Sequence, residues 1–422
     1  LTEPKAIYAY DDSDIAIPTI VLDEIDKHKH RQDTVGFNAR KVNRLLDALR
    51  ADGNYVDGIS LGEGKGEIFV AHYDDRHMPV GLYQGESDNK ILAAAISLRE
   101  KGKDVIVVSR DLNMRIKCDG FGIESHDYEI DKVVRSVDHL FTGVKELTVT
   151  DEQIDAFYQK GKITLKDQKN KLYPNEFVVL KSDADGKQSA LCKNTQKGKL
   201  VPVNKHTDIW GMLPRNKEQQ FALDLLFDPK IELVSLIGAA GTGKTLLATA
   251  AGLEQVVHST KKNGGYDKLI ITRPVQPMGR DIGFLPGSIE EKMAPWVAPI
   301  KDNLQFLFGD KTALEMQIDQ GTIEIEAMTY IRGRSIANAF IIVDEAQNLT
   351  MHELKTIITR VGDNTKIVLT GDIQQIDNVY VDAVSNGLTH AVEKFKEQEI
   401  SGHITLNKGE RSTLATLASE IL

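Results

Sequence analysis

The sequence predicts an α/β protein in which two regions of alternating strands and helices flank a small β-rich segment. Residues 1–140 alternate short apolar runs, such as 15–22 and 104–108, with a helical pattern at 88–100, and we expect 104–108 to be a fully buried strand. Residues 213–422 show the alternation more strongly, and we expect strands there to end at Ile237, Thr272, Val343 and Thr370. Such alternation is typical of parallel sheets covered by helices. Ligands then bind beyond the carboxyl ends of the strands, so these four ends should converge on one site.

The segment between these regions, residues 141–212, has a different pattern. Short strand patterns occur at 146–150, 177–180, 189–192 and 200–203, with an Asp185-Gly186 turn signal between two of them. These features predict a small antiparallel β-module. From Lys160 to Lys205 it carries eleven lysines and four acidic residues, although the whole chain has a net charge of −10. Such a block is either a solvated face or a phosphate-binding surface, and its place in a separate segment favours phosphate binding.

Composition limits the classes of protein that the chain can represent. Its 422 residues allow two or three domains, and 41% apolar with 27% charged residues is ordinary for a globular protein. Cys118 and Cys192 are far apart and form no C-x-x-C motif, which favours a reducing compartment. No apolar run approaches the ~20 residues that span a bilayer. We therefore expect a cytoplasmic protein with no membrane partner.

The most specific motif is G-x-x-x-x-G-K-T at 238–245, which follows the apolar run 233–237 and precedes a helical pattern. A glycine-rich turn without a ligand is the alternative, but strand, loop and helix together predict a P-loop that binds ATP. Lys244 is expected to contact the β- and γ-phosphates, and the Thr245 hydroxyl to bind Mg²⁺. The expected nucleotide-binding residues are Gly238, Ala239, Ala240, Gly241, Thr242, Gly243, Lys244, Thr245 and Leu246.

Two acidic residues follow the apolar run 340–343, and we expect their strand end to be adjacent to that of the P-loop strand. Asp344 is expected to hold Mg²⁺, and Glu345 to orient or deprotonate the attacking water. Acids in this position often mark only a helix N-terminus, but the upstream P-loop favours the catalytic interpretation.

Two further elements resemble motifs of superfamily-one helicases. Gly371, Asp372 and Gln375 match a G-D-x-x-Q segment, which in that group senses the γ-phosphate and links it to the nucleic-acid channel. Gln219 matches an adenine-reading glutamine, whose amide can pair with the adenine edge. Phosphoryl transfer also needs an arginine near the γ-phosphate. Arg411 is the favoured candidate, acting within its own chain or on a neighbour's nucleotide; the others are Arg273, Arg332, Arg334 and Arg360.

From Arg215 to the end, the chain resembles the PhoH family of P-loop ATPases. The resemblance rests on 238–245, 272–286 (TRPVQPMGRDIGFLP), 290–296 (EEKMAPW), 330–335 (YIRGRS), 344–349 (DEAQNL) and 409–412 (GERS). The first 140 residues resemble a PIN domain, a metal-dependent ribonuclease fold, through 21–28 (VLDEIDKH), 37–40 (FNAR), 88–92 (DNKIL) and 107–113 (VVSRDLN). Together the resemblances imply a P-loop NTPase domain of superfamily-one helicase type, ATP-driven unwinding of single-stranded RNA coupled to its cleavage, and a ring, expected to be a hexamer.

The PIN resemblance also implies a metal site. Glu24, Asp88 and Asp111 match family ligands of Mg²⁺ or Mn²⁺, with Asp119 as a fourth, although Asp88 could equally cap its helix. The opening Leu1-Thr-Glu-Pro resembles the segment after a first strand that ends in a further ligand Asp. We therefore expect a site that lacks one ligand, with strong ATP hydrolysis and weak RNA cleavage.

Three classes of function remain open at this point. One is an RNA-stimulated ATPase that feeds RNA to a nuclease, and another is an RNA-binding ATPase switch whose PIN domain is a docking platform. The third is a P-loop kinase or protein-remodelling ATPase. The Gly371–Gln375 element favours the helicase class over kinases, and the lysine-rich segment favours RNA over protein. The sequence does not separate the enzyme from the switch.

Overall fold

A computed structural model of the chain divides into two compact units, Leu1–Lys132 and Val133–Leu422. It describes residues 1–422 except 1–3, 5, 11–12, 32–33, 75, 77, 80–81, 84, 129–133, 135, 165–170, 184–187, 196–197, 259–264, 275–288, 332–333, 379–380 and 410–422. Among the described residues, no helix has the length and apolar character needed to cross a membrane.

The first unit contains a three-stranded sheet with helices packed beside it. Strands β1 (Ile15–Pro18) and β3 (Glu67–Ala71) pair in parallel, and β2 (Ile59–Ser60) pairs antiparallel with β3. Helices α1 (Thr19–His28), α2 (Thr34–Leu49) and α3 (Ser87–Glu100) accompany this sheet. Ile17, Leu46 and Ile68 belong to its core, so the sheet and α2 bury apolar side chains against one another.

A second pair of strands in this unit corrects one expectation. Strand β4 (Ile106–Val108) pairs in parallel with β5 (Glu124–His126), and α4 (Leu112–Gly120) connects them. The run 104–108 was expected to be a buried strand, but Ile106 is 46% and Val108 38% exposed. The reason is that, among the described strands, β4 pairs with β5 alone, so little covers its outward side chains.

The second unit begins with a five-stranded sheet in the order β6-β8-β9-β10-β7. Its strands are β6 (Val144–Val149), β7 (Ile163–Thr164), β8 (Phe177–Ser182), β9 (Ser189–Asn194) and β10 (Lys199–Pro202). The prediction of an antiparallel module is wrong for one pair, since β6 and β8 run in parallel. Helix α5 (Asp151–Lys160), which follows β6, lets the chain return before β8 begins, as a parallel connection requires. The predicted Asp185-Gly186 turn lies outside the described residues.

This sheet packs directly onto the rest of the unit. Phe177 of β8 stacks on Phe221 of α6 (Lys217–Phe227), with ring centroids 4.4 Å apart. Lys193 of β9, expected at a phosphate-binding surface, is instead buried, with its Nζ 2.9 Å from Asp224 and 2.8 Å from Asp228. Burial also lowers the pKa of the neighbouring Lys366 to about 7, against the opposing charge of Asp228. The five-stranded sheet is therefore anchored by buried charges.

The main sheet of the unit has six strands, all parallel, in the order β13-β12-β14-β15-β11-β16. They are β11 (Leu233–Gly238), β12 (Lys268–Arg273), β13 (Ile323–Ala327), β14 (Ala339–Val343), β15 (Lys366–Gly371) and β16 (Ser401–Leu406). The expected strand ends were correct to within one residue. Alternate residues of one strand enter different cores: Val234 and Leu236 lie in one, and Leu233 and Ile237 in the other. A sheet buried on both faces explains the near-continuous apolar runs of the sequence.

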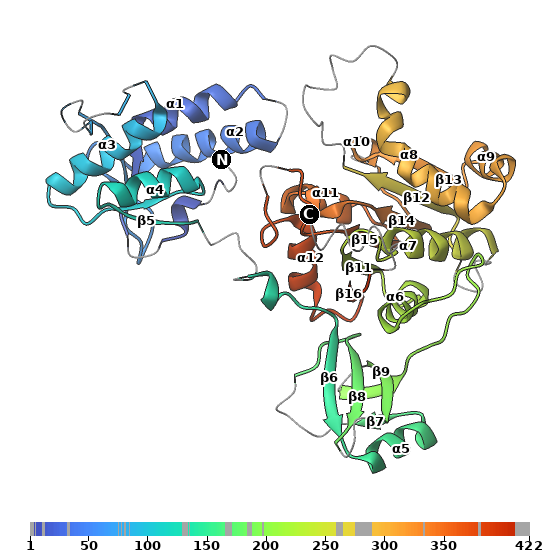
Figure 1. The fold of residues 1–422 in the computed structure, drawn as a ribbon. Coiled ribbons are helices and arrows are strands. Elements are labelled where there is room, and N and C mark those ends of the chain that lie inside the picture. The colour runs from blue at the N-terminus through green and yellow to red at the C-terminus, as the bar shows by residue number, and fades with distance from the viewer. Residues whose placement is uncertain are drawn as a thin grey trace. The chain divides into compact units, whose positions relative to one another are not determined.

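Helices cover both faces of this sheet (Figure 1). Helices α6 and α7 (Lys244–Leu253) lie on one face, and α11 (Met351–Ile358) and α12 (Gly387–Phe395) on the other. Helices α8 (Ile289–Phe308), α9 (Lys311–Asp319) and α10 (Met328–Ile331) lie towards the β12–β13 edge. At the carboxyl ends of the central strands, loops follow directly.

Candidate nucleotide site

Four strand ends of the main sheet meet at one edge, as the sequence predicts. The strand order differs from the prediction in one respect. Strand β15 lies between β11, which leads into the P-loop, and β14, which leads into the two acids. The ends of β11 and β14 were expected to be adjacent. The loop after β15 is thus placed between the P-loop and Asp344-Glu345, where it can contact both.

The P-loop turns tightly from β11 into α7. Gly241 and Gly243 have φ values of 84° and 87°, a left-handed backbone that favours glycine. Gly243 is the N-cap of α7, so the first amides of that helix face the loop, where an anion binds favourably. Lys244 is buried, with Nζ 3.5 Å from the Ala239 carbonyl. The loop therefore has the shape of a phosphate cradle.

Asp344 receives hydrogen bonds from two hydroxyl groups. Thr245 Oγ1 donates to its Oδ1 at 2.9 Å, and Thr370 Oγ1 donates to the same oxygen at 2.6 Å. The carboxylate is buried and lies between the start of α7 and the end of β15. Thr245 and Asp344, the two residues expected to hold Mg²⁺, are thus in direct contact. Their oxygen atoms are of the kind that Mg²⁺ prefers, so the site fits the ion.

Glu345 has an unusual backbone and is held from two sides. Its φ is 55°, in the left-handed region that non-glycine residues seldom adopt. Oε1 lies 3.4 Å from Nη2 of Arg273, and Oε2 accepts a hydrogen bond from Gln347 at 2.5 Å. The side chain is 27% exposed, so it remains accessible.

The loop after β15 touches the P-loop itself. The backbone amide of Ala240 donates to Oδ2 of Asp372 at 3.1 Å, and the amide of Gln374 donates to Oδ1 at 3.0 Å. Asp372 is buried, whereas the Gln375 side chain is exposed. The loop therefore contacts the P-loop through Asp372 and is exposed at the surface at Gln375.

Gln219, the residue expected to read adenine, contacts the P-loop directly, and its adenine-reading role stays a prediction. It is buried, its Nε2 donates to the Thr242 carbonyl at 3.1 Å, and its Oε1 accepts from the Arg215 amide at 2.8 Å. The amide thus ties α6 to the P-loop. Leu246, in the first turn of α7, is only partly buried.

The described part of the chain places one of the candidate arginines at the site. Arg411 and Arg332 lie outside the described residues. Arg334 pairs with Glu326 at 3.0 Å, and Arg360 is exposed beyond α11. Arg273, through Glu345, is the candidate that the described structure places beside the two acids.

The carboxylates expected at a metal site in the first unit do not converge. Among the described residues, no three His, Cys, Asp or Glu side chains lie close enough to hold a metal ion. Asp88 is in the first turn of α3 and pairs with Lys117 at 3.2 Å, while the N-cap position belongs to Glu86. Asp111 caps α4 by accepting from the Asn113 amide at 2.8 Å. Glu24 lies on α1 and Asp119 on α4. The expectation that these four face one another is wrong for this structure.

Two residues at the nucleotide site, Thr370 and Gln347, were not among those predicted from the sequence. Thr370 is the last residue but one of β15, where its polarity in an apolar run was the available signal. Gln347 lies two residues after Glu345 and is fully buried. Its signal was the polar Gln-Asn pair that follows Asp344-Glu345-Ala346.

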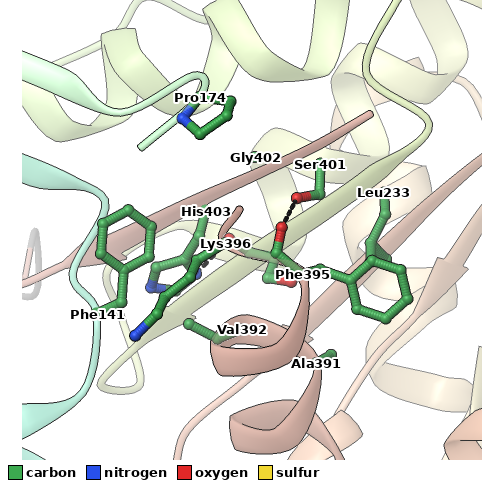
Figure 2. Close-up of a pocket in the computed structure, with 11 residues that line it drawn as sticks. Phe141, Pro174, Leu233, Ala391, Val392, Phe395, Lys396, Ser401, Gly402 and His403 are labelled. Atoms are coloured by element: carbon green, nitrogen blue, oxygen red, sulfur yellow. Dashed lines mark hydrogen bonds between the residues drawn. The ribbon is translucent and has the colours of Figure 1, made fainter. Parts of the chain in front are cut away.

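A small cavity beside β16 does not compete with this site (Figure 2). It is lined by Phe141, Lys396 and His403 among others, and its volume of about 10 Å³ holds about one water molecule. Burial lowers the pKa of His403 to about 3, so the ring is neutral at physiological pH. Its Nδ1 lies 3.0 Å from the Ser235 carbonyl and must therefore carry the proton. This histidine joins β16 to the P-loop strand.

A glycine-rich loop between a central parallel strand and a helix, facing a buried aspartate from another strand end, defines a P-loop nucleoside triphosphatase. Comparisons with known proteins agree with this class. Residues 212–421 match the family model described as PhoH-like protein, and residues 1–129 match the model of a PIN domain.

Relatives extend the match to the whole chain. Protein PhoH2 of Bacillus subtilis is 45% identical over 437 residues, which cover 100% of this chain and 97% of the relative. Protein PhoH2 of Mycolicibacterium smegmatis is 33% identical, covering 100% and 94%. Protein PhoH of Escherichia coli is 37% identical over 204 residues, covering 48% of this chain and 54% of the relative. The chain belongs to the PhoH family, as a PhoH-like ATPase with an N-terminal PIN domain.

Proposed function

We propose that the chain is an RNA-stimulated ATPase that moves along single-stranded RNA, and that its PIN domain cleaves this RNA with a divalent metal. The observation that carries the first part is the hydrogen bond from the Ala240 amide to Asp372. A bound phosphate would compete with Asp372 for the P-loop amides, because both are anions. Nucleotide binding would then displace the loop that exposes Gln375 at the surface. This is the link that a nucleic-acid-dependent ATPase needs.

The hydrolytic roles follow from the positions of the side chains. Lys244 would contact the β- and γ-phosphates, and Asp344 and Thr245 would hold Mg²⁺, which neutralises the developing charge when bound. Glu345 would accept the proton of the attacking water, since it is the partly exposed carboxylate beside the buried Asp344.

The RNA surface that we propose includes only some of the lysines of the segment 160–205. Lys193 is buried, Lys181 pairs with Glu146, and Lys171 pairs with Glu397. Lys160, Lys162 and Lys199 are exposed and form no ion pair within the described part of the chain. They lie together because α5 ends at Lys160 and β7, which follows, pairs Thr164 with Lys199. We call these three lysines the basic edge.

Replacing the three lysines of the basic edge with glutamine is expected to weaken the binding of all single-stranded RNA sequences alike. Three phosphate contacts contribute a slope of about −2 to the dependence of log affinity on log salt, so the triple variant should lose about that much. Fluorescence anisotropy at several salt concentrations measures this slope. Lys171→Gln with Lys181→Gln is the matched control, since these lysines already have carboxylate partners. An unchanged slope in the triple variant would make the basic edge a solvated face.

The nuclease part of the proposal rests on the PIN domain alone. Cleavage is expected to be weak, because Glu24, Asp88, Asp111 and Asp119 are not gathered and metal affinity grows with the number of converging carboxylates. The alternative is a PIN domain that serves as a docking platform for a partner.

Labelled single-stranded RNA, incubated with the full chain in Mg²⁺ or Mn²⁺, separates these alternatives. We expect slow, metal-dependent cleavage that Asp88→Asn abolishes and that the exposed-site control Glu63→Gln leaves intact. An absence of cleavage in a preparation that hydrolyses ATP would favour the docking platform.

We also propose that the ATPase works as a ring, a hexamer, in which Arg411 reaches a γ-phosphate. This proposal rests on the family resemblance and on the need for a charge-stabilising arginine. Sedimentation under the conditions of the ATPase assay tests it, and an active monomer would remove the ring from the mechanism.

A further inference from the structure

Gln347 connects the proposed catalytic acid to the loop after β15. It lies in the short 3₁₀ turn Ala346–Asn348, and its side chain is fully buried. Its Nε2 donates to Glu345 Oε2 at 2.5 Å and to the Gln375 carbonyl at 2.8 Å. Its Oε1 accepts from the Asp372 amide at 3.1 Å. Both ends of residues 372–375 are thus held by the same side chain that holds Glu345.

The backbone of β15 leaves room for this amide. A Cβ added to Gly371 would lie 2.4 Å from Oε1 of Gln347, closer than Cβ atoms approach other atoms in proteins. A residue with a side chain there would therefore push Gln347 away. Glycine at the end of β15 thus leaves the space in which Gln347 contacts the following loop.

Glu345 needs support from its neighbours because its own backbone conformation is strained. A left-handed φ in a non-glycine residue costs about 1–3 kcal/mol and persists only where neighbours enforce it. Its two carboxylate oxygens have different partners: Arg273 from the end of β12, and Gln347 from the turn after β14. Arg273 is partly exposed, whereas Gln347 is not. Of the two, only Gln347 also contacts the loop.

We propose that Gln347 is a positioning residue, which sets the Glu345 carboxylate according to the position of residues 372–375. The inference rests on the proposed role of Glu345 in ATP hydrolysis. The Asp372 backbone amide and the Gln375 carbonyl both hydrogen-bond the side-chain amide of Gln347. When the loop shifts, this side chain shifts with it, and Glu345 Oε2, which accepts a hydrogen bond from Gln347, moves as well. Because Asp372 also binds the P-loop amide of Ala240, the loop responds to whatever binds the P-loop. RNA bound at the loop would then change turnover through Gln347.

The test replaces Gln347 with glutamate. Gln347→Glu keeps the volume and an oxygen for the Asp372 amide, but removes both N–H donors. We expect kcat to fall about 100-fold, as misplacement of a catalytic group by about 1 Å does, while KM and the affinity for a fluorescent ADP analogue change less than about threefold. Stimulation by single-stranded RNA should be lost. Gln398→Glu, an exposed glutamine of the same unit, is the control for the added charge.

A double variant distinguishes positioning from a general structural effect. If Gln347 acts through Glu345, adding Gln347→Glu to Glu345→Gln should lower the residual rate no further. A further drop would assign Gln347 a separate role and overturn the proposal. Gln347→Met, of similar length and uncharged, should reproduce the loss of kcat. If neither Gln347 variant folds, as judged by thermal melting, the residue is structural and the proposal is also wrong.

Failure of the proposed ATPase role gives a different result. If Glu345→Gln alone turns over ATP at the wild-type rate, the role of Glu345 is wrong. If Glu345→Gln is inactive but Gln347→Glu and Gln347→Met are as active as the wild type, the positioning role alone is overturned.

Discussion

Glu345→Gln is expected to lower ATP turnover by about 10²–10⁴-fold and to leave nucleotide binding in place. The amide keeps the size of the carboxylate and can still contact Arg273 or Gln347, but it cannot accept a proton from water. A positioned general base contributes about 10²–10⁴ to the rate, and the loss of turnover should fall in this range. Steady-state phosphate release measures turnover, and titration with a fluorescent ADP analogue measures binding.

Lys244→Ala should instead weaken nucleotide binding, and turnover with it, in the same two assays. Its Nζ lies within the P-loop, so its removal takes a positive charge from the phosphate site and weakens binding itself. Glu315→Gln, an exposed change on α9, is the neutral control. Wild-type turnover by Glu345→Gln would contradict the assignment of the base. Loss of nucleotide binding in that variant would mean that Glu345 supports the loop rather than the chemistry.

Lys193→Met is expected to lower the free energy of unfolding by about 3–5 kcal/mol, the usual cost of removing one partner of a buried ion pair. Lys193 lies between Asp224, whose side chain is 0% exposed, and Asp228. Its removal leaves the Asp224 carboxylate buried without its counter-charge. The effect should exceed that of any exposed lysine in the same segment, and urea unfolding measures it.

Two variants complete this test. Lys199→Met, on the neighbouring strand, is exposed and should change stability by less than about 0.5 kcal/mol. Asp224→Asn added to Lys193→Met should recover part of the loss, because it removes the uncompensated charge. Equal stability of Lys193→Met and Lys199→Met would show that the buried pair contributes nothing.

The parts of the fold that the sequence predicts well are those set by local pattern. The strand 233–237, the P-loop and the helix after it are continuous in the chain, and each has its own signal. The apolar strands of the main sheet were recognisable because both of their faces are buried. The pairing of Thr245 with Asp344 followed from the rule that ligands bind at strand ends.

The features that the sequence did not predict depend on contacts between distant residues. The position of β15 between β11 and β14 is a matter of strand order, which no local pattern encodes. Lys193 resembles the exposed lysines around it, and only the packing of β9 on α6 reveals that Asp224 and Asp228 enclose it. Gln347 finds two of its partners, Asp372 and Gln375, in the loop after β15, 25 and 28 residues further along the chain.

The proposed function is tested most directly by the rate of ATP hydrolysis by the full chain, measured with and without Mg²⁺ and over a titration of single-stranded RNA. We expect hydrolysis that requires Mg²⁺, rises with RNA to a plateau, and is at least about 100-fold slower in Glu345→Gln. Hydrolysis at one rate whatever the RNA concentration, or no hydrolysis in Mg²⁺ at all, would contradict the proposed function.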